Sequence, residues 1–461
     1  MASHTVTIDG EASFADKKLQ CQKAAEDLQI KYISIVGESF GNDDSGILKR
    51  ILKLISMEGR KWNGIKLLNC TGDLGMVVDA VLKTKVRKLV IKDATSHVLS
   101  SLGKGLASNS SLLILELHDM TLNGSDIRSL FDSLSKSPIM ELHLDNSTFV
   151  GDAHIAFGDG LRVAESMQSL SLKGCGLRDE QCEVINNSLV DHKSLLELNF
   201  EGNSCINEGM NALSRVMKTT NLLVLDMGAQ QFSDSQTIQL KAFADALEVA
   251  PIRYVQLSDN RIDETNMSEL FRGVGTTSSI EILNVSWCSV STKSLGALAN
   301  ALGQTSSIRS VNLFGCGIDD NGVKQMAKSL HAWKIKKLDL GGRQSYTEEG
   351  ISELMSQLQD NMYLEEILLN TTTCITNRFF LDVNRGGRKF VLYKDQAPVG
   401  LWPNLLHRAQ KVPLPRTSDL WLSNLTAETE KKTTSKELES DESRRASVLF
   451  HLLRDGLIPS I

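Results

Sequence analysis

One sequence pattern recurs through the middle of the chain and constrains the fold more than any other feature. It reads Leu-x-Leu or a close apolar variant, often with Cys or Asn three residues further on, and it returns every 27 to 30 residues. A fixed period of this length, with apolar residues at fixed offsets, predicts a stack of repeated structural units. The ten copies begin at Leu112, Ile139, Met167, Leu195, Leu222, Ile252, Ile280, Ile308, Ile335 and Leu364.

Each unit carries two periodicities, one in each half. Alternation of apolar and polar residues in the first half predicts a short strand. In the second half, sets such as Leu295, Leu298 and Leu302 have the spacing of one helix face. Because one unit cannot bury its apolar face alone, neighbouring units must stack. We therefore expect an α/β solenoid, a right-handed horseshoe with parallel strands on its concave side and helices on its convex side.

The repeats resemble those of leucine-rich-repeat proteins. The segment SLGALANALGQTSSIRSVNLFGCGIDDNGVKQMAKSL, with its three-turn helix, is similar to the ribonuclease-inhibitor-like subclass. That subclass includes the Ran GTPase-activating proteins and the repeat arrays of immune receptors, so the resemblance implies action through protein contact. The tail motifs LDVNRGGRKF, PVGLWPNLLHRA and VLFHLLRDG are similar to tails of uncharacterised leucine-rich-repeat proteins of microalgae.

Four segments follow from the pattern and from charge. We expect residues 1–24 to be disordered, residues 25–85 to form degenerate N-terminal cap repeats, and residues 86–370 to form about eleven repeats of 26–30 residues. Residues 371–411 carry seven Lys or Arg against two Asp, whereas the preceding array is acidic. We expect residues 371–461 to form a C-terminal cap segment, with a disordered charged loop near 425–445 because that stretch lacks apolar periodicity.

The exposed strand positions form two columns along the predicted concave face, and most of their side chains are polar. Two imidazoles and three carboxylates gather where Glu116, His118, Glu141, His143 and Asp145 meet, a set that could hold a divalent ion. A solvated wall of ion pairs explains the same residues, and we predict no metal. The predicted partner-binding residues are Glu116, His118, His143, Asp145, Lys173, Glu197, Glu201, Asp226, Tyr254 and Phe314.

Other kinds of chemistry find little support in the sequence. Cys175, Cys288 and Cys316 occupy one repeat position together with Asn203 and Asn260, so we interpret these thiols as structural. The chain lacks a phosphate-binding Gly-Lys-Ser/Thr loop and a recognisable catalytic triad, so we predict neither a cofactor nor an enzyme. The acidic array disfavours nucleic acid. Without an apolar run of about 18 residues or a secretory signal, we expect no membrane span and a cytoplasmic location, with the nucleus as the alternative.

The sequence predicts a non-enzymatic scaffold that binds a protein partner on the concave strand face. One alternative is a Ran-like GTPase-activating protein, with a small GTPase as its partner. Another is a ubiquitin-ligase adaptor or a sensor-type recognition module. Ser447 follows Arg444 and Arg445, which fits a phosphosite for basophilic kinases, although the residue also suits the N-cap of a helix.

Overall fold

The computed structural model describes residues 5–27, 29–40, 47–57, 62–72, 74–94, 97–230, 238–370, 381, 384 and 385. The chain divides into two units, Met1–Val290 and Ser291–Ile461. Both alternate strand and helix along the chain, and in both the strands pair in parallel, which makes the fold an α/β leucine-rich-repeat solenoid.

The first unit is built on a parallel sheet whose spatial order follows the sequence, so each strand pairs with the strand of the next repeat. Two pairs of two-residue strands lie beyond the ends of the main strands: β3 (Ser39–Phe40) with β5 (Thr71–Gly72), and β8 (Thr121–Leu122) with β10 (Thr148–Phe149). The main strands are β1 (Thr5–Asp9), β2 (Tyr32–Val36), β4 (Gly64–Leu68), β6 (Lys88–Lys92), β7 (Ile114–His118), β9 (Glu141–His143), β11 (Ser169–Ser171), β12 (Glu197–Asn199), β13 (Val224–Asp226), β14 (Tyr254–Gln256) and β15 (Ile282–Asn284).

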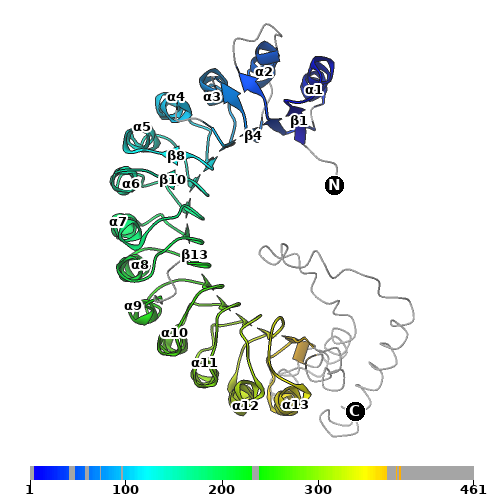
Figure 1. Cartoon of the computed structure of the whole chain (residues 1–461), viewed down its shortest axis with the longest axis vertical. Helices are drawn as coiled ribbons and strands as arrows, with labels where there is room; N and C mark the ends of the chain where they lie inside the picture. Colours follow the sequence, from blue (N-terminus) through cyan, green and yellow to red (C-terminus); the bar gives the residue numbers. More distant parts are fainter. Residues whose placement is uncertain are drawn as a thin grey trace, which may run out of the picture. The chain divides into compact units, whose positions relative to one another are not determined.

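A layer of helices covers one face of this sheet, and the other face carries no helix in the described part of the unit (Figure 1). The short 3-10 helix η1 (Leu106–Ser108) follows α4. The α-helices are α1 (Phe14–Glu26), α2 (Ile47–Ile55), α3 (Gly75–Leu82), α4 (His97–Gly105), α5 (Gly124–Leu134), α6 (Ala153–Leu161), α7 (Asp179–Leu189), α8 (Glu208–Thr219), α9 (Lys241–Ala246) and α10 (Glu264–Thr276).

The second unit repeats the same arrangement. Strand β17 pairs in parallel with both β16 and β18. Its elements are α11 (Thr292–Gln304), β16 (Ser310–Asn312), α12 (Asp320–Ser329), η2 (Leu330–Ala332), β17 (Lys337–Asp339), α13 (Glu348–Ser356), η3 (Gln357–Asp360) and β18 (Glu366–Leu368).

The strands lie where the repeat pattern predicts them. Their central apolar residues point toward the helices and nearly all are buried, so within each unit every repeat adds one layer to the core. The predicted centres are confirmed at Leu115, Leu142, Leu170, Leu198, Leu225, Val255, Leu283, Val311, Leu338 and Ile367.

The N-terminus departs from the sequence prediction. Residues 1–24 were expected to be disordered, but residues 5–24 hold β1 and most of α1, so that prediction is wrong for them. Val6 and Ile8 alternate with polar residues and are 7% and 0% exposed, which gives β1 one buried face against α1, while its edge pairs with β2. Ser13 begins α1, since its hydroxyl accepts a hydrogen bond from the Asp16 N–H at 3.2 Å.

In several repeats, the turn after the strand is fixed by one side chain that reaches the backbone of the preceding repeat. The Asn203 amide donates to the Leu172 carbonyl at 2.8 Å, and the Asn260 amide donates to the Met227 carbonyl at 2.8 Å. At the same position Cys175 and Cys288 donate a thiol hydrogen bond, the latter to the Leu257 carbonyl at 3.2 Å. These cysteines therefore have the structural role that the sequence assigns to them.

The segment after the repeats is described at three residues, Leu381, Asn384 and Arg385. Asn384 is buried, and its amide donates to the carbonyls of Asn361 and Leu364 at 2.9 and 3.0 Å, so it contacts the last described repeat. The rest of the predicted cap (371–461), its charged loop (425–445) and Ser447 lie outside the described residues. Among the described helices, none has the length and apolar character needed to cross a membrane.

Candidate functional site

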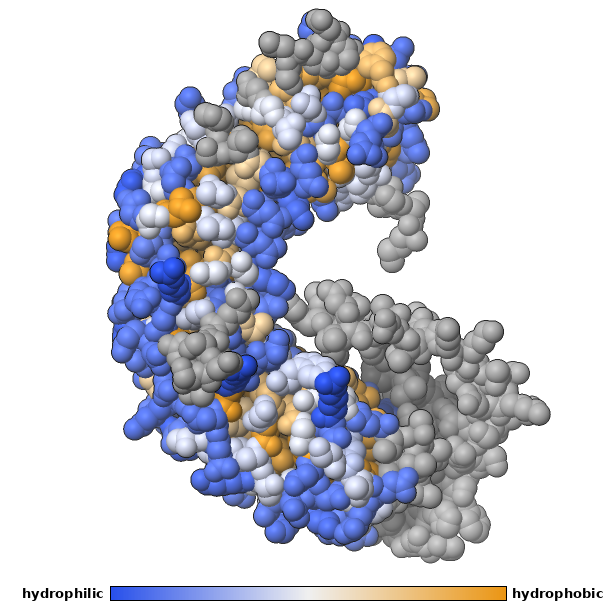
Figure 2. Space-filling view, in the orientation of Figure 1, coloured by the Kyte–Doolittle hydropathy of each residue, from blue (hydrophilic) through white to orange (hydrophobic). Residues whose placement is uncertain are grey.

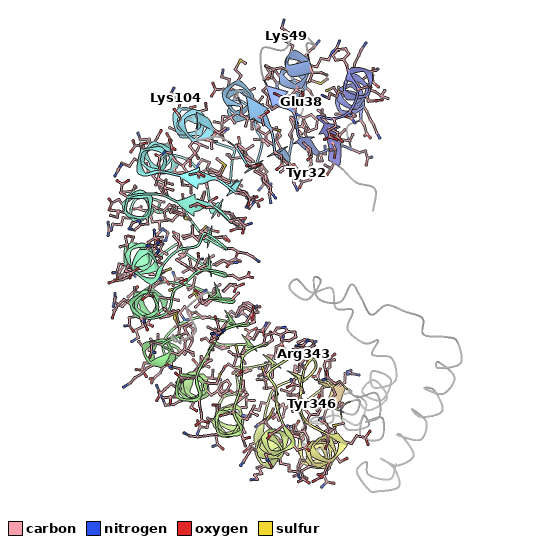
Figure 3. The ribbon with its side chains drawn as sticks, in the orientation of Figure 1. Tyr32, Glu38, Lys49, Lys104, Arg343 and Tyr346 are labelled. Atoms are coloured by element: carbon pink, nitrogen blue, oxygen red, sulfur yellow. The ribbon has the colours of Figure 1, made fainter. Side chains whose placement is uncertain are left out.

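We use the term open face for the side of each unit's sheet that lies opposite its helices. Side chains project from the strands on this side, among them Tyr32 of β2 (Figure 3). In the first unit the strand register aligns one open-face residue from each repeat, as predicted. That row consists of Glu116, His143, Ser171, Asn199, Asp226, Gln256 and Asn284.

Glu116 lies at the centre of an ion-pair cluster at the start of this row. Its carboxylate is 2.6 Å from Lys88 Nζ, 3.3 Å from His118 Nε2 and 3.8 Å from His143 Nδ1. Burial alone would raise the pKa of Glu116, but hydrogen bonds from His118 and Lys88 outweigh it and lower the pKa to about 2. Glu116 is therefore ionised and internally compensated, and Lys88 is a partner that the sequence interpretation missed.

Asp145 extends the cluster along the sheet. It accepts a hydrogen bond from the Ser171 hydroxyl at 2.5 Å and lies 3.9 Å from His118 Nδ1. The structure thus brings Glu116, His118, His143 and Asp145 together, as the sequence predicts. In the described part of the chain, no group of three or more His, Cys, Asp or Glu side chains is arranged to hold a metal ion.

A second group lies further along the open face of the first unit. Lys173 and Glu201 form an ion pair of 2.6 Å. Asp226 is 8% exposed, and burial raises its pKa to about 6. Tyr254, on the next strand, has a pKa raised to about 12 by burial and by the charge of Asp226. Among these predicted site residues, Asp226 is the carboxylate that the fold most disfavours in its charged form.

A local turn explains why an oxygen acceptor recurs in the row. Asp226 Oδ1 accepts the Gly228 N–H at 3.0 Å, and Asn199 and Asn284 accept the N–H two residues ahead of them at 2.8 and 2.9 Å. The turn needs one acceptor, and an amide oxygen supplies it as well as a carboxylate does. The sequence interpretation missed this structural role, although Asn or Asp recurs at this position in several copies.

Glu197 is the predicted site residue whose charge the structure leaves least compensated. It is exposed on β12, and its carboxylate accepts a 3.3 Å hydrogen bond from the Ser169 hydroxyl. No ion pair joins it to a Lys or Arg among the described residues. Beside it, the register places Val224, Tyr254 and Ile282. Val224 and Ile282 were not predicted, although their shared first position in the strand was readable from the repeat alignment.

The last predicted residue, Phe314, belongs to the second unit. Its ring lies against two glycines, since a Cβ on Gly341 would be 3.1 Å and one on Gly342 2.7 Å from ring atoms. The half-buried ring thus packs on the backbone of these glycines, where the Cβ of a larger residue would clash with it.

Figure 2 shows hydrophilic residues over much of the visible surface, interrupted by scattered apolar ones.

The thiols are placed for packing and not for reaction. The described cysteines are buried. Burial raises the pKa of Cys175 and of Cys288 to about 12, so neither supplies a thiolate near neutral pH.

A family model described as "Leucine Rich repeat" matches residues 305–327, which contain β16 and most of α12. The chain is a leucine-rich-repeat protein. Over 87 residues, 18% of its length, it is 33% identical to the Homo sapiens protein "NACHT, LRR and PYD domains-containing protein 5". The match spans 7% of that human protein.

Several solved structures are similar to this leucine-rich-repeat protein. An internalin from Listeria monocytogenes has a TM-score of 0.41 and 14% identity, covering 74% of this chain and 87% of the internalin. TLR13, from its complex with ssRNA13, has a TM-score of 0.36 and 15% identity, covering 74% and 38%. Leiomodin-1 actin-binding site 2 has a TM-score of 0.27 and 15% identity, covering 29% and 81%. The fold assignment rests on the strand register and the repeats.

Proposed function

We propose that this leucine-rich-repeat protein is a non-enzymatic scaffold that binds a partner protein on its open face. The observation that carries the proposal is Asp226. The turn after β13 needs only an acceptor oxygen, which Asn199 and Asn284 supply elsewhere without a charge. Burial disfavours the ionised Asp226, so its charge weakens the fold. A buried, destabilising charge on an accessible face is typical of a site kept for binding.

The extent of the open face supports the same proposal. From β6 to β15 the first unit presents eight strands, and a spacing of about 4.8 Å between neighbours gives roughly 34 Å of surface. A standard protein interface needs on the order of 800 Å² on each partner, which a surface of this length can supply.

The absence of catalysis is part of the proposal. Glu116 and Asp145 are held by ion pairs and hydrogen bonds, and the pKa of the Cys175 thiol is raised to about 12. These groups are therefore poorly placed to act as a nucleophile and its base. The GTPase-activating and ubiquitin-ligase alternatives, each with its own partner, stay predictions.

The subclass and the compartment are further parts of the proposal. Helices such as α10 and α11, with 13 residues each, support a ribonuclease-inhibitor-like repeat. Cys175 and Cys288 are buried thiols that donate hydrogen bonds to backbone carbonyls, which suits a reducing compartment, so we propose the cytoplasm, with the nucleus as the alternative.

Site-specific photo-crosslinking tests the binding face. A photoreactive amino acid replaces Ser258, beside β14 on the open face, or Lys218, exposed on α8, and each variant is irradiated in lysate. We expect protein adducts from position 258 and few from position 218. Adducts from position 218 alone would move the binding site to the helical side and refute the proposal.

A further inference from the structure

The first position of each strand forms a second row on the open face of the first unit. The register aligns one residue from each repeat along it, and we call the part from β9 to β15 the edge row. The edge row consists of Glu141, Ser169, Glu197, Val224, Tyr254 and Ile282.

One half of the edge row is apolar. Val224, Tyr254 and Ile282 are direct neighbours on three adjacent strands, about 4.8 Å apart. Ile282 is 40% exposed, and the other two are partly exposed. Single exposed apolar residues are common on protein surfaces, but contiguous ones on an otherwise polar face mark a contact surface.

The other half of the edge row is acidic. Three nearby carboxylates have a basic partner. Glu116 and Glu201 each lie 2.6 Å from a lysine, and Glu281, which immediately precedes β15, pairs with Arg253. Glu141 and Glu197 differ, because no ion pair joins either carboxylate to a Lys or Arg in the described part of the unit. The Ser169 hydroxyl, between them in the register, donates to Glu197 at 3.3 Å. The edge row thus offers two uncompensated negative charges beside an apolar strip.

We propose that the edge row binds an extended segment of the partner protein in which one or two basic residues lie about three residues from a large apolar residue. The inference rests on the proposed function, since it names the partner chemistry for the same face. Charge complementarity selects this occupant: Lys or Arg neutralises Glu197 and Glu141, and the apolar side chain covers Tyr254 and Ile282. An acidic segment would bring like charges together, at a cost in affinity.

The geometry sets the spacing of the segment. Glu197 and Tyr254 are two strands apart, or roughly 10 Å, which an extended chain covers in about three residues at about 3.4 Å each. The segment lies across the strands, with its basic end over β9 to β12 and its apolar end over β13 to β15.

Selection from a random peptide library displayed on phage, with the purified full chain as bait, tests this chemistry without a known partner. We expect enriched peptides to carry Lys or Arg about two to four residues from Leu, Ile, Phe or Trp, in either order. Their affinities are then measured by fluorescence anisotropy. Because Glu197→Lys reverses the charge that attracts the basic residues, it should weaken binding of the enriched peptides at least about tenfold, or about 1.4 kcal/mol. The same variant should bind peptides whose basic residues are changed to Glu, which restores the charge complementarity.

Two further variants complete the test. Ile282→Ser should weaken basic and charge-swapped peptides alike, and its melting temperature should stay near wild type because the side chain is already exposed. Glu180→Lys, which makes the same charge change on the exposed side of α7, is the matched control and should leave binding unchanged.

Three results would overturn the inference: no enriched peptide, enrichment of acidic or uncharged peptides, or peptides that bind the Glu197→Lys and Ile282→Ser variants as well as wild type. If crosslinks from position 258 still capture a partner, the open-face scaffold stands and only the assigned chemistry is wrong. If those crosslinks are lost as well, both proposals fail.

Discussion

Replacing Asp226 with Asn should stabilise the protein at neutral pH. The residue is 8% exposed, and its Oδ1 accepts the Gly228 N–H at 3.0 Å. Asn keeps that acceptor and removes the charge, as Asn199 and Asn284 do at equivalent positions in the register. The substitution therefore isolates the effect of the buried charge on the free energy of unfolding.

The pKa shift gives the magnitude and the sign. Burial raises the pKa of Asp226 from 3.8 to about 6, and one pKa unit corresponds to about 1.4 kcal/mol, so the ionised carboxylate costs about 3 kcal/mol. The fold favours the protonated acid. The penalty is therefore complete above about pH 6, shrinks as the pH falls, and vanishes below the unfolded value of 3.8.

Urea unfolding followed by circular dichroism, at pH 7.5 and at pH 4.5, measures this effect. We expect Asp226→Asn to raise the free energy of unfolding by about 2 to 3 kcal/mol at pH 7.5 and by about 1 kcal/mol at pH 4.5. Asp259→Asn, at an exposed turn after β14, is the control and should change stability by no more than about 0.5 kcal/mol. A variant no more stable than wild type at pH 7.5, or a gain independent of pH, would refute the reasoning.

Three further predictions concern other parts of the fold. Asp179→Ala should lower the free energy of unfolding by about 2 to 3 kcal/mol in urea, because the carboxylate accepts four N–H groups, from residues 206 to 209, at the start of α8; an unchanged midpoint would contradict this. Glu116→Gln should cost about 1 to 2 kcal/mol at pH 7. Because the pKa of Glu116 is lowered from 4.5 to about 2 in the folded protein, its stabilising effect is complete above pH 4.5 and lost as the pH falls toward 2. A difference in unfolding free energy between wild type and Glu116→Gln that persists at pH 2 would contradict this prediction. Gly296 lies in α11, and a Cβ added there has no neighbour within 4 Å. Gly296→Ala should therefore raise the free energy of unfolding by about 0.5 to 1 kcal/mol and the melting temperature with it, whereas a lower melting temperature would contradict this.

The sequence by itself determined the architecture, because repetition turns a local pattern into a global constraint. Each copy must bury the same apolar positions against its neighbours, so a residue such as Leu198 has one acceptable place in the sheet. The open-face row that contains Glu116 and Asp226 follows from the same register. The N-terminal β1 was missed because its five residues alternate too briefly to be distinguished from a polar segment, and only packing against α1 gives it a buried face.

The tertiary structure decided which of the open-face charges are balanced. Glu116, Glu197 and Glu201 look alike in the sequence, but lysines from neighbouring repeats pair with two of them and leave Glu197 uncompensated. Burial of Asp226 is likewise set by the strands on either side of its own. Periodicity fixes where a backbone position lies. Ion pairing and desolvation depend instead on side chains that meet across repeats, about 27 residues apart in sequence, and these side chains differ from one repeat to the next.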